Sequence, residues 1–359
     1  MENKEHTCST PASESSVSSS PEDSKTGSGH AARYAKVYGF FGFNRAYNFP
    51  LWVIFAGAML GFSLSRLPEL NYSHFFKEDD MADFGMVPGY WYYVKSGSFR
   101  VGMIMHLATI LPAGILMVLQ FTPIIRHKFI TFHRINGYTV LLLILISNAA
   151  ACMVLRHNHG GGARIAAQSA EAFLVIITTL GLSMAWWNIR CKQVDQHRAW
   201  MLRTMFYMGT IITSRFMEFA ASPIITRIGG YYGVWSCDEI EFLYTQYQLP
   251  FPEQDYPQCF LPDGTLNRAF RVAINAAAIE TKPEQLSSSL VQPFGALLWI
   301  CIVVHLIGVE IYLGMTPREA ERLRQVSYEK QLEAGFANPG CAGLTADRWG
   351  DAEKWTPKR

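Results

Sequence analysis

Charged side chains are scarce in this sequence: Asp, Glu, Lys and Arg make up 17% of its 359 residues, below the roughly 25% usual for soluble domains. The formal net charge is only +2, and no basic stripe with interleaved aromatic residues is present, so nucleic acid is not an expected partner. None of the seven cysteines has Cys-x-x-Cys spacing, which argues against a zinc ribbon or a thioredoxin-type site.

Several catalytic motifs are also missing. The chain has no glycine-rich phosphate loop and no Gly-x-Ser-x-Gly elbow. His157 and His159 precede a run of three glycines, with no cysteine or carboxylate ligand nearby, which is typical of a flexible turn rather than a metal site. We therefore expect no metal.

The first 30 residues lack apolar runs and are rich in Ser, Pro, Glu and Lys. Such a segment cannot bury enough apolar surface to offset the entropy of ordering, so we expect a disordered tail over 1–30. It has no apolar core of a cleavable signal peptide. The first apolar helix would then act as an uncleaved signal anchor.

Long apolar runs are what the sequence has in abundance, since 50% of its residues are hydrophobic. A membrane-spanning helix needs about 20 predominantly apolar residues. The sequence predicts an all-α, multi-pass transmembrane bundle over 31–316 with about six helices, of which only the second is interrupted by proline. The expected spans are 49–67, 101–124, 135–155, 165–187, 199–221 and 292–313.

Basic residues predict the orientation of this bundle. They concentrate between the second and third spans, between the fourth and fifth, and after the sixth, all on one side of a six-helix arrangement. By the positive-inside rule that side faces the cytosol, as do both termini. We expect the membrane to be the endoplasmic reticulum or another membrane of the secretory pathway.

The longest loop, 222–290, is expected on the outer side, with one amphipathic helix over 268–281. It contains Cys237 and Cys259, for which an oxidising lumen would permit a disulfide, although their separation in space is open. Asn71 heads the sequon Asn71-Tyr72-Ser73, also on the outer side, and is a predicted glycosylation site. Residues 317–359 are expected to form a charged cytosolic helix and a loosely ordered tail.

Polar side chains at bilayer depth form an outer group. Inserting a charged side chain at this depth costs at least about 2.5–3.5 kcal/mol, so its presence indicates a functional or structural role. Arg215 and Glu218 stand three residues apart and can pair on one helix. The group contains His106, Asn148, Gln168, Glu171, Arg215 and Glu218. It predicts either a pocket with an acid in its wall or a set of packing contacts between helices.

An inner group repeats a His-Arg pair at the start of two helices. It contains His133, Arg134, His197, Arg198 and Arg203. These residues predict a site for an anion or a cofactor on the cytosolic side. The alternative is that arginine and histidine side chains simply extend to the lipid head groups. His305, in the middle of the sixth span, is more typical of a hydrogen-bonded packing residue than of a ligand.

These motifs resemble a known family. The pattern is His106, Gln120-Phe121-Thr122-Pro123, Arg126, His133-Arg134-Ile135-Asn136-Gly137, His197-Arg198-Ala199-Trp200-Met201-Leu202-Arg203 and Arg215. It is similar to a widespread family of predicted membrane proteins long described as a domain of unknown function. Tyr138 stands where an arginine is usual. Within that family, long fungal members resemble membrane-bound terpene cyclases of meroterpenoid pathways, of the ascochlorin, ascofuranone and macrophorin types.

The resemblance implies an isomerase that cyclises a prenylated phenol or epoxycyclohexenone. A lipid-soluble substrate would enter from the membrane lipids, and no cofactor would be required. One acid, one base and a water-excluding cavity suffice for such chemistry. We expect Glu218 or Glu171 to be the acid, positioned by Arg215 or His106. The other expected substrate-binding residues are Asn148, Gln168, Phe216 and Phe219.

Two other classes of function remain open. Several histidines in a helical bundle also suggest a haem-bearing electron-transfer protein, in which His133 and His197 could form one ligand pair. His106 and His305 lie at different expected depths and make a poor second pair. A transporter or a non-enzymatic scaffold is the third possibility, but no internal repeat and no matching pair of broken helices is evident.

Overall fold

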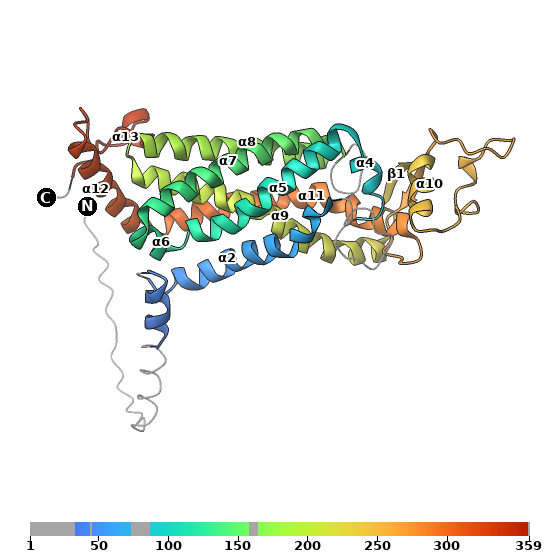
Figure 1. Cartoon of the computed structure of the whole chain (residues 1–359), viewed down its shortest axis with the longest axis horizontal. Helices are drawn as coiled ribbons and strands as arrows, with labels where there is room; N and C mark the ends of the chain where they lie inside the picture. The colour runs from blue at the N-terminus through green and yellow to red at the C-terminus, as the bar shows by residue number, and fades with distance from the viewer. Residues whose placement is uncertain (1–32, 44, 73–86, 158–163, 358–359) are drawn as a thin grey trace, which may run out of the picture.

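The computed structural model describes residues 33–43, 45–72, 87–157 and 164–357. The tail expected over 1–30 lies outside these residues. Within the described residues, long helices run side by side along the long axis of the molecule (Figure 1). They are α2 (Asn48–Ser65), α5 (Gly97–Gln120), α7 (Ile130–Val154), α8 (Ile165–Arg190), α9 (Val194–Ile228) and α11 (Pro283–Gly314).

Five of these helices are long and apolar enough to cross a membrane: α2, α5, α8, α11 and the helix that begins at Ile130. The predicted all-α, multi-pass membrane bundle is therefore confirmed. α9 is also long, with 35 residues, and it packs against α8 and α11. It is less apolar than the other five, because charged residues such as Arg203, Arg215 and Glu218 recur along it.

Small residues allow the helices to approach one another closely. A Cβ atom on Gly295 of α11 would lie 2.6 Å from the backbone nitrogen of Ala167 in α8, and one on Gly114 of α5 would lie 2.2 Å from the hydroxyl of Ser63 in α2. Close backbone contact of this kind stabilises helix pairs in a bilayer, where the hydrophobic effect between helices is weak. Gly295 thus sets the spacing of α11 against α8, whereas Gly114 leaves room for the Ser63 side chain of α2.

Proline lies inside three of the helices, not one as expected. Pro112 is inside α5, Pro223 inside α9 and Pro293 inside α11. Neighbouring helices can re-satisfy the backbone groups that a proline frees in a membrane protein. The expectation that only one span is interrupted was wrong, because α9 and α11 extend well beyond the apolar windows read from the sequence.

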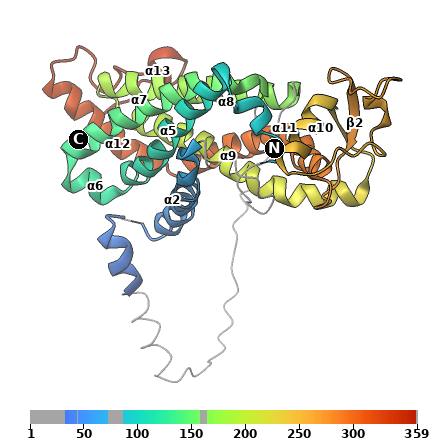
Figure 2. The same ribbon diagram turned by 45° about the vertical axis from the view of Figure 1, so that its right-hand side comes forward.

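A small domain stands at one end of the bundle (Figure 2). Its two-stranded antiparallel sheet joins β1 (Tyr232–Ser236) and β2 (Arg271–Asn275), with Tyr232 opposite Asn275. α10 (Cys237–Gln246) and the short η3 (Pro257–Cys259) complete it. A disulfide joins Cys237 to Cys259, and both cysteines are buried with Trp235, Ile240 and Ile274.

This domain corrects two expectations. Residues 268–281 do not form an amphipathic helix; β2 begins at Arg271 instead, because Val272 and Ile274 alternate into the core with the period of a strand. The loop is also shorter than the expected 222–290, because α9 continues to Ile228 and α11 begins at Pro283.

Short helices close the remaining connections. η1 (Leu67–Leu70) follows α2, and α4 (Trp91–Val94) packs on α5 near α10. η2 (Leu155–His157) ends the third long helix. α6 (Pro123–Lys128) links α5 to α7 at the opposite end of the bundle, where it lies next to α12 (Pro317–Glu333) (Figure 1).

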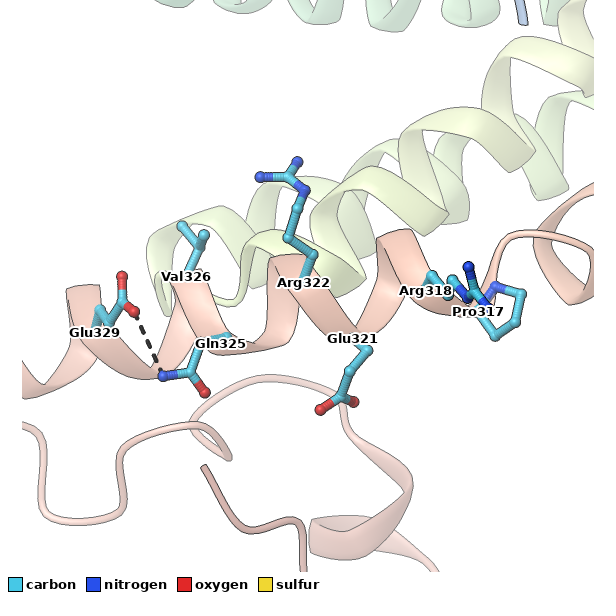
Figure 3. A pocket seen from close by; sticks show the side chains of 7 residues that line it. All are labelled: Pro317, Arg318, Glu321, Arg322, Gln325, Val326 and Glu329. Carbon is cyan, nitrogen blue, oxygen red and sulfur yellow. Dashed lines mark hydrogen bonds between the residues drawn. The ribbon is translucent and has the colours of Figure 1, made fainter. Parts of the chain in front are cut away.

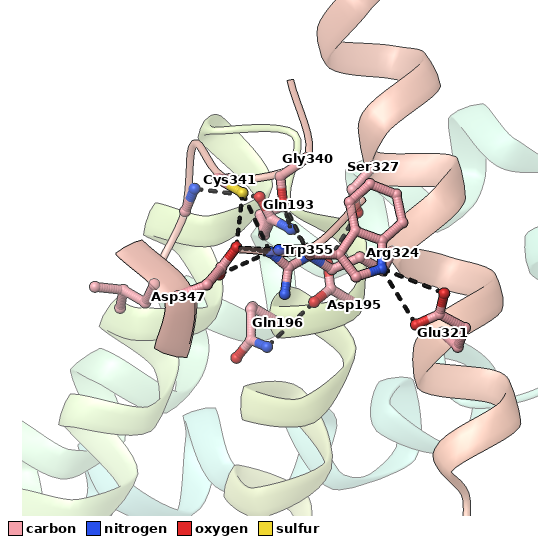
Figure 4. Close-up of polar contacts among 12 residues, drawn as sticks. Gln193, Asp195, Gln196, Glu321, Arg324, Ser327, Gly340, Cys341, Asp347 and Trp355 are labelled. Carbon is pink, nitrogen blue, oxygen red and sulfur yellow. Dashed lines mark hydrogen bonds and ion pairs between the residues drawn. The ribbon is translucent and has the colours of Figure 1, made fainter. Parts of the chain in front are cut away.

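The segment after α12 is folded onto the bundle, not loosely ordered as expected. It contains α13 (Ala346–Trp349) and packs against the turn between α8 and α9 (Figure 4). The Gln193 amide nitrogen donates to the Gly340 carbonyl at 3.0 Å, and its oxygen accepts from the Gly343 amide at 3.2 Å. This segment is held by buried hydrogen bonds. The pattern of apolar residues along the sequence does not reveal such bonds.

Candidate functional site

Arg215 lies at the centre of the predicted outer group. Its Nη1 atom donates to Oε2 of Glu218 at 3.0 Å, one turn further along α9. Its guanidinium carbon lies 5.1 Å from the centre of the Phe294 ring on α11. Phe294 and Glu218 are both buried. The predicted Arg215–Glu218 pair is thus formed and is covered by an aromatic ring from a second helix.

Two further carboxyl groups lie within electrostatic range of Arg215. One is Glu171 on α8 and the other is Glu69 in η1. Glu69 also forms a salt bridge with Arg66, with Nη1 and Oε1 2.8 Å apart. We call Arg66, Glu69, Glu171, Arg215 and Glu218 the outer polar cluster. It combines three carboxyl groups with two guanidinium groups, so one carboxyl lacks a matching cation within the cluster.

Glu171 is the carboxyl group without a direct partner. Among the residues that the structure describes, it forms no hydrogen bond and no ion pair, whereas Glu218 and Glu69 each bind an arginine. Burial raises the pKa of Glu69, and the nearby guanidinium groups of Arg66 and Arg215 oppose this rise. The cluster therefore contains carboxyl groups in unequal environments, which is the arrangement that separates an acid from a base.

The other polar residues of the predicted group bind elsewhere. The His106 ring nitrogen Nδ1 lies 2.9 Å from the Ser147 hydroxyl, so it joins α5 to α7. Asn148 donates to the hydroxyls of Thr178 and Thr179 on α8. Two helical turns, roughly 10 Å, separate Glu171 from Thr178.

Gln168 lies one turn from Glu171 on α8, but its amide donates to the carbonyl of Arg156 at 3.1 Å. It therefore ties the start of α8 to the end of the preceding helix. The structure does not bring the side chains of His106, Asn148 and Gln168 into contact with the outer polar cluster.

The two phenylalanines expected to contact a substrate face outward. Phe216 is 71% exposed and Phe219 is 53% exposed. In a bundle of this kind such side chains contact lipid. Two other aromatic rings reach the cluster. The centre of the Phe62 ring lies 5.5 Å from the guanidinium carbon of Arg66, and Phe294 lies beside Arg215 because α11 packs on α9.

Sequence reasoning also missed Arg66 and Glu69. Arg66 lies at the end of the expected first span and Glu69 just after it, in Arg66-Leu67-Pro68-Glu69, which resembles an ordinary solvated helix end. The only signal was the three-residue spacing of opposite charges beside a proline. Glu69 is nevertheless buried, because η1 packs on α5.

The inner group divides into two parts. Arg203 forms two hydrogen bonds with Glu310 of α11, at 2.6 and 3.0 Å, and stacks on Trp200. Arg198 lies next to Thr316 and over the ring of Tyr312. These two arginines therefore connect α9 with the inner end of α11.

The second part joins the two His-Arg motifs. His133 and His197 lie within electrostatic range of each other, and the Nδ1 atom of His197 lies 2.9 Å from the carbonyl of Ala185. The Nε2 atom of His133 lies 3.4 Å from the Gln120 amide. Arg134 is exposed. The paired motifs thus meet at the inner end of the bundle.

His305 has both ring nitrogens engaged. Nε2 lies 2.9 Å from the Thr213 hydroxyl, and Nδ1 lies 2.6 Å from the carbonyl of Phe206. This is the packing role expected from the sequence. Within the described ranges, no group of three or more His, Cys, Asp or Glu side chains is arranged to hold a metal ion.

A family model matches residues 103–235, a segment that covers most of α5, all of α6, α7, α8 and α9, and most of β1. The family is described as predicted membrane protein (DUF2306). No curated protein and no solved structure matched the chain. The match covers Glu171, Arg215 and Glu218 and both His-Arg motifs, but not Glu69 or Phe294.

Proposed function

We propose that this chain is a membrane-bound terpene cyclase, an isomerase of meroterpenoid biosynthesis that acts on a prenylated phenol or epoxycyclohexenone. The observation that carries the proposal is the unpaired carboxyl group of Glu171 next to the ion-paired Arg215 and Glu218. Cyclisation of this kind requires an acid and a base in one apolar chamber.

The proposed reaction is a proton-initiated isomerisation. The Glu171 carboxyl gives its proton to the epoxide oxygen or to a terminal olefin carbon of the substrate. A neighbouring double bond then attacks the electron-poor carbon, so that a carbon–carbon bond forms as the carbon–oxygen or olefin π bond breaks. The final cation loses a proton to the Glu218 carboxylate, and the product has the same atoms as the substrate.

The roles of the remaining residues follow from their positions. Arg215 holds the Glu218 carboxylate in position by a charge-assisted hydrogen bond. The ring of Phe294 lies over the guanidinium of Arg215 and helps to hold it beside Glu218. His106, Asn148 and Gln168 act as helix-joining residues that hold α5, α7 and α8 in place rather than as groups that touch the substrate.

The test compares carboxyl-to-amide variants at both ends of the bundle. Glu171→Gln and Glu218→Gln should each reduce product formation in microsomes at least about 100-fold, the usual contribution of general acid–base catalysis. Glu310→Gln is the matched control, because Glu310 is a carboxylate ion-paired at the inner end, and it should retain activity. Full activity of both cluster variants would remove the proposed acid and base.

The proposed orientation places the disulfide-bonded domain in the lumen of the secretory pathway and both termini in the cytosol. A disulfide forms and persists in oxidising compartments, which supports a luminal position for Cys237 and Cys259. Asn71 is exposed just after η1 and would be glycosylated on that side. Digestion of intact microsomes with protease should remove the C-terminal segment and spare the disulfide domain.

A haem-bearing electron-transfer protein is the second candidate. One observation favours it, namely the approach of His133 to His197. Their ligation of haem would require His197 to keep its Nδ1 contact with Ala185 and to bind iron through Nε2. A Soret band in the purified protein would support this candidate and count against the cyclase.

A further inference from the structure

Three arginines converge at the inner end of the bundle, from three separate elements. They are Arg126 in α6, Arg198 in α9 and Arg322 in α12, which we call the inner arginine cluster. Arg126 is within electrostatic range of both other arginines. α6 and α12 lie next to each other (Figure 1), and α12 packs against α9. The cluster therefore depends on the fold and not on one helix.

The positive charge of this cluster is only partly balanced. One carboxylate, Glu319, interacts with the cluster and binds Arg322 through two hydrogen bonds of 2.8 and 2.7 Å. Glu319 also acts electrostatically on Arg126 and Arg198. Three guanidinium groups thus surround one carboxylate that is already bound to one of them, and His127 adds a fourth basic side chain at the edge.

Arg198 is held in place by neutral groups. Its Nη2 atom lies 3.5 Å from the Thr316 hydroxyl, and its guanidinium lies 5.8 Å from the centre of the Tyr312 ring. The Tyr312 hydroxyl in turn donates to Asn48 of α2 at 3.2 Å. None of these partners carries a negative charge. Arg198 is therefore oriented without being neutralised.

Arg126 has no direct partner in the part of the chain that the structure describes: it makes no hydrogen bond and no ion pair there, although Glu319 is within electrostatic range. Its side chain is partly buried. Leaving a partly buried guanidinium next to two others is unfavourable unless an anion offsets their repulsion. The inner arginine cluster thus has the properties of an anion site.

A groove of about 620 Å³ runs along α12 beside this cluster, and Arg322 forms part of its wall (Figure 3). Gln325, Val326 and Glu329 continue the same wall. The groove is open and is lined by α12 alone, with the carboxylates of Glu321 and Glu329 beside the basic Arg318 and Arg322, so it leaves space next to Arg322. It lies at the opposite end of the bundle from the outer polar cluster.

We propose that Arg126, Arg198 and Arg322 bind a phosphate group. A guanidinium presents several N–H donors in a planar fork that matches phosphate oxygens, and two or three such forks can share one phosphate. The phosphate belongs either to the head group of an anionic lipid in the inner leaflet or to a soluble phosphate compound. This site is independent of the proposed cyclisation, because its residues lie outside the outer polar cluster.

The test uses the full chain in nanodiscs and has two arms. In the first, the discs contain only phosphatidylcholine, and inorganic pyrophosphate is titrated against the protein by calorimetry at constant ionic strength. In the second, the discs contain a fraction of phosphatidic acid, and native mass spectrometry counts the phosphatidic acid retained by the protein. Binding in the first arm assigns a soluble compound, and retention only in the second assigns a lipid.

Arg126→Gln is the main variant, and Arg134→Gln is its matched control, because Arg134 is an exposed arginine at the same end of the bundle. Loss of a charge-assisted hydrogen bond predicts roughly tenfold weaker binding for Arg126→Gln and less than about twofold for the control. Arg126→Lys keeps the positive charge but not the planar guanidinium, so its affinity should lie between those of Arg126→Gln and Arg134→Gln. Binding by this variant would show that a change at position 126 does not simply misfold the protein.

Two results would overturn the phosphate site. One is the absence of binding in both arms for the unchanged protein. The other is an equal loss for Arg126→Gln and Arg134→Gln, which would mean that the inner surface attracts anions only by its overall charge.

Discussion

The carboxylate of Glu218 accepts a hydrogen bond from Arg215 at 3.0 Å inside the bundle, with only 4% of the Glu218 side chain exposed. The chain also contains a contrasting pair of the same residue types. Arg203 binds Glu310 at 2.6 Å, but 55% of the Glu310 side chain is exposed. Both ion pairs use an arginine of α9. The Arg215–Glu218 pair is buried and lies within that helix, whereas the Arg203–Glu310 pair is more exposed and joins α9 to α11, so the two offer an internal comparison.

The first prediction uses this comparison. Arg215→Met removes the ion-pair partner of Glu218 on α9 and should lower the free energy of unfolding by about 3–5 kcal/mol, the usual cost of breaking a buried pair. Arg203→Met should cost less than about 1 kcal/mol, because its partner is exposed to solvent. Thermal unfolding in detergent measures both. Equal losses would mean that burial of Glu218 does not govern the energy of its ion pair.

The second prediction concerns the disulfide between Cys237 and Cys259, which are 22 residues apart. Replacing both cysteines by serine should destabilise the small domain that contains β1 and β2 by about 3 kcal/mol, because the unfolded chain gains entropy when the cross-link is absent. Thermal unfolding followed by Trp235 fluorescence measures the loss. Cys152→Ser is the control, since Cys152 is free and exposed. A loss of the same size in Cys152→Ser would contradict the prediction.

The third prediction concerns pH and the C-terminal segment. Burial opposes ionisation of Asp347, but hydrogen bonds from Cys341 and Arg324 outweigh it and hold the pKa of Asp347 below its ordinary value of 3.8. The folded state therefore binds this proton less readily than the unfolded state. The stabilisation is fully present above about pH 4 and is lost as pH falls below it, with a slope of up to about 1.4 kcal/mol per pH unit.

Hydrogen exchange of residues 334–357 between pH 6 and pH 3 measures this loss, after correction for the intrinsic exchange rate. Asp347→Asn should have weaker protection at pH 6 and a flatter dependence on pH. Asp351→Asn is the control, because Asp351 is exposed. A pH dependence unchanged by Asp347→Asn would assign the acid sensitivity to another group.

The fourth prediction concerns the contact between α11 and α8. A methyl group on Gly295 would meet the backbone of Ala167 at 2.6 Å, which a side-chain rotation cannot relieve. Gly295→Ala should therefore destabilise the protein by about 1–3 kcal/mol and shift Phe294 away from Arg215. Gly308→Ala on the same helix is the control, since its nearest neighbour lies at 4.0 Å. Comparable melting temperatures for the two variants would show that α11 can move away from α8 at little cost.

The positions of the helices were predictable because apolar length dominates the choice of structure in a bilayer. Their ends were not. α11 begins nine residues before the expected window, since it starts at Pro283 and not at Gln292. Its first turn contains Glu284, which is fully buried and accepts hydrogen bonds from Tyr244 at 2.8 Å and Tyr256 at 2.9 Å. These two tyrosines belong to the small domain that contains β1 and β2, and hydropathy along the chain cannot reveal such contacts.

The candidate site was predictable only where it depends on local spacing. The Arg215–Glu218 pair follows from the three-residue separation on a helix. The electrostatic contact of Glu171 with Arg215 agrees with the prediction that both belong to the outer group. By contrast, Phe294 reaches Arg215 only because α11 packs closely on its neighbours, and Phe216, adjacent to Arg215 in sequence, faces outward. Tertiary packing decides which face of a largely apolar helix turns inward.

The strand β2 was missed for a related reason. Residues 268–281 contain enough alanine to suggest a helix, and intrinsic helix propensity favours that choice. The pairing of Val272 with Trp235 on β1, next to the buried disulfide, outweighs the propensity. A contact between residues so far apart in sequence is not visible in either segment alone.

The fold of residues 334–357 has a consequence for anyone who shortens this protein for expression. Gln193, Gln331 and Asn188 are almost wholly enclosed, and each makes hydrogen bonds to the backbone of Gly340, Gly343 or Leu344. Deleting the stretch after Glu333 would uncover these amides and strip them of those bonds. A truncated protein that ends just past the final membrane helix, as hydropathy alone would suggest, would therefore lack these buried hydrogen bonds. Purification tags are better joined beyond Pro357.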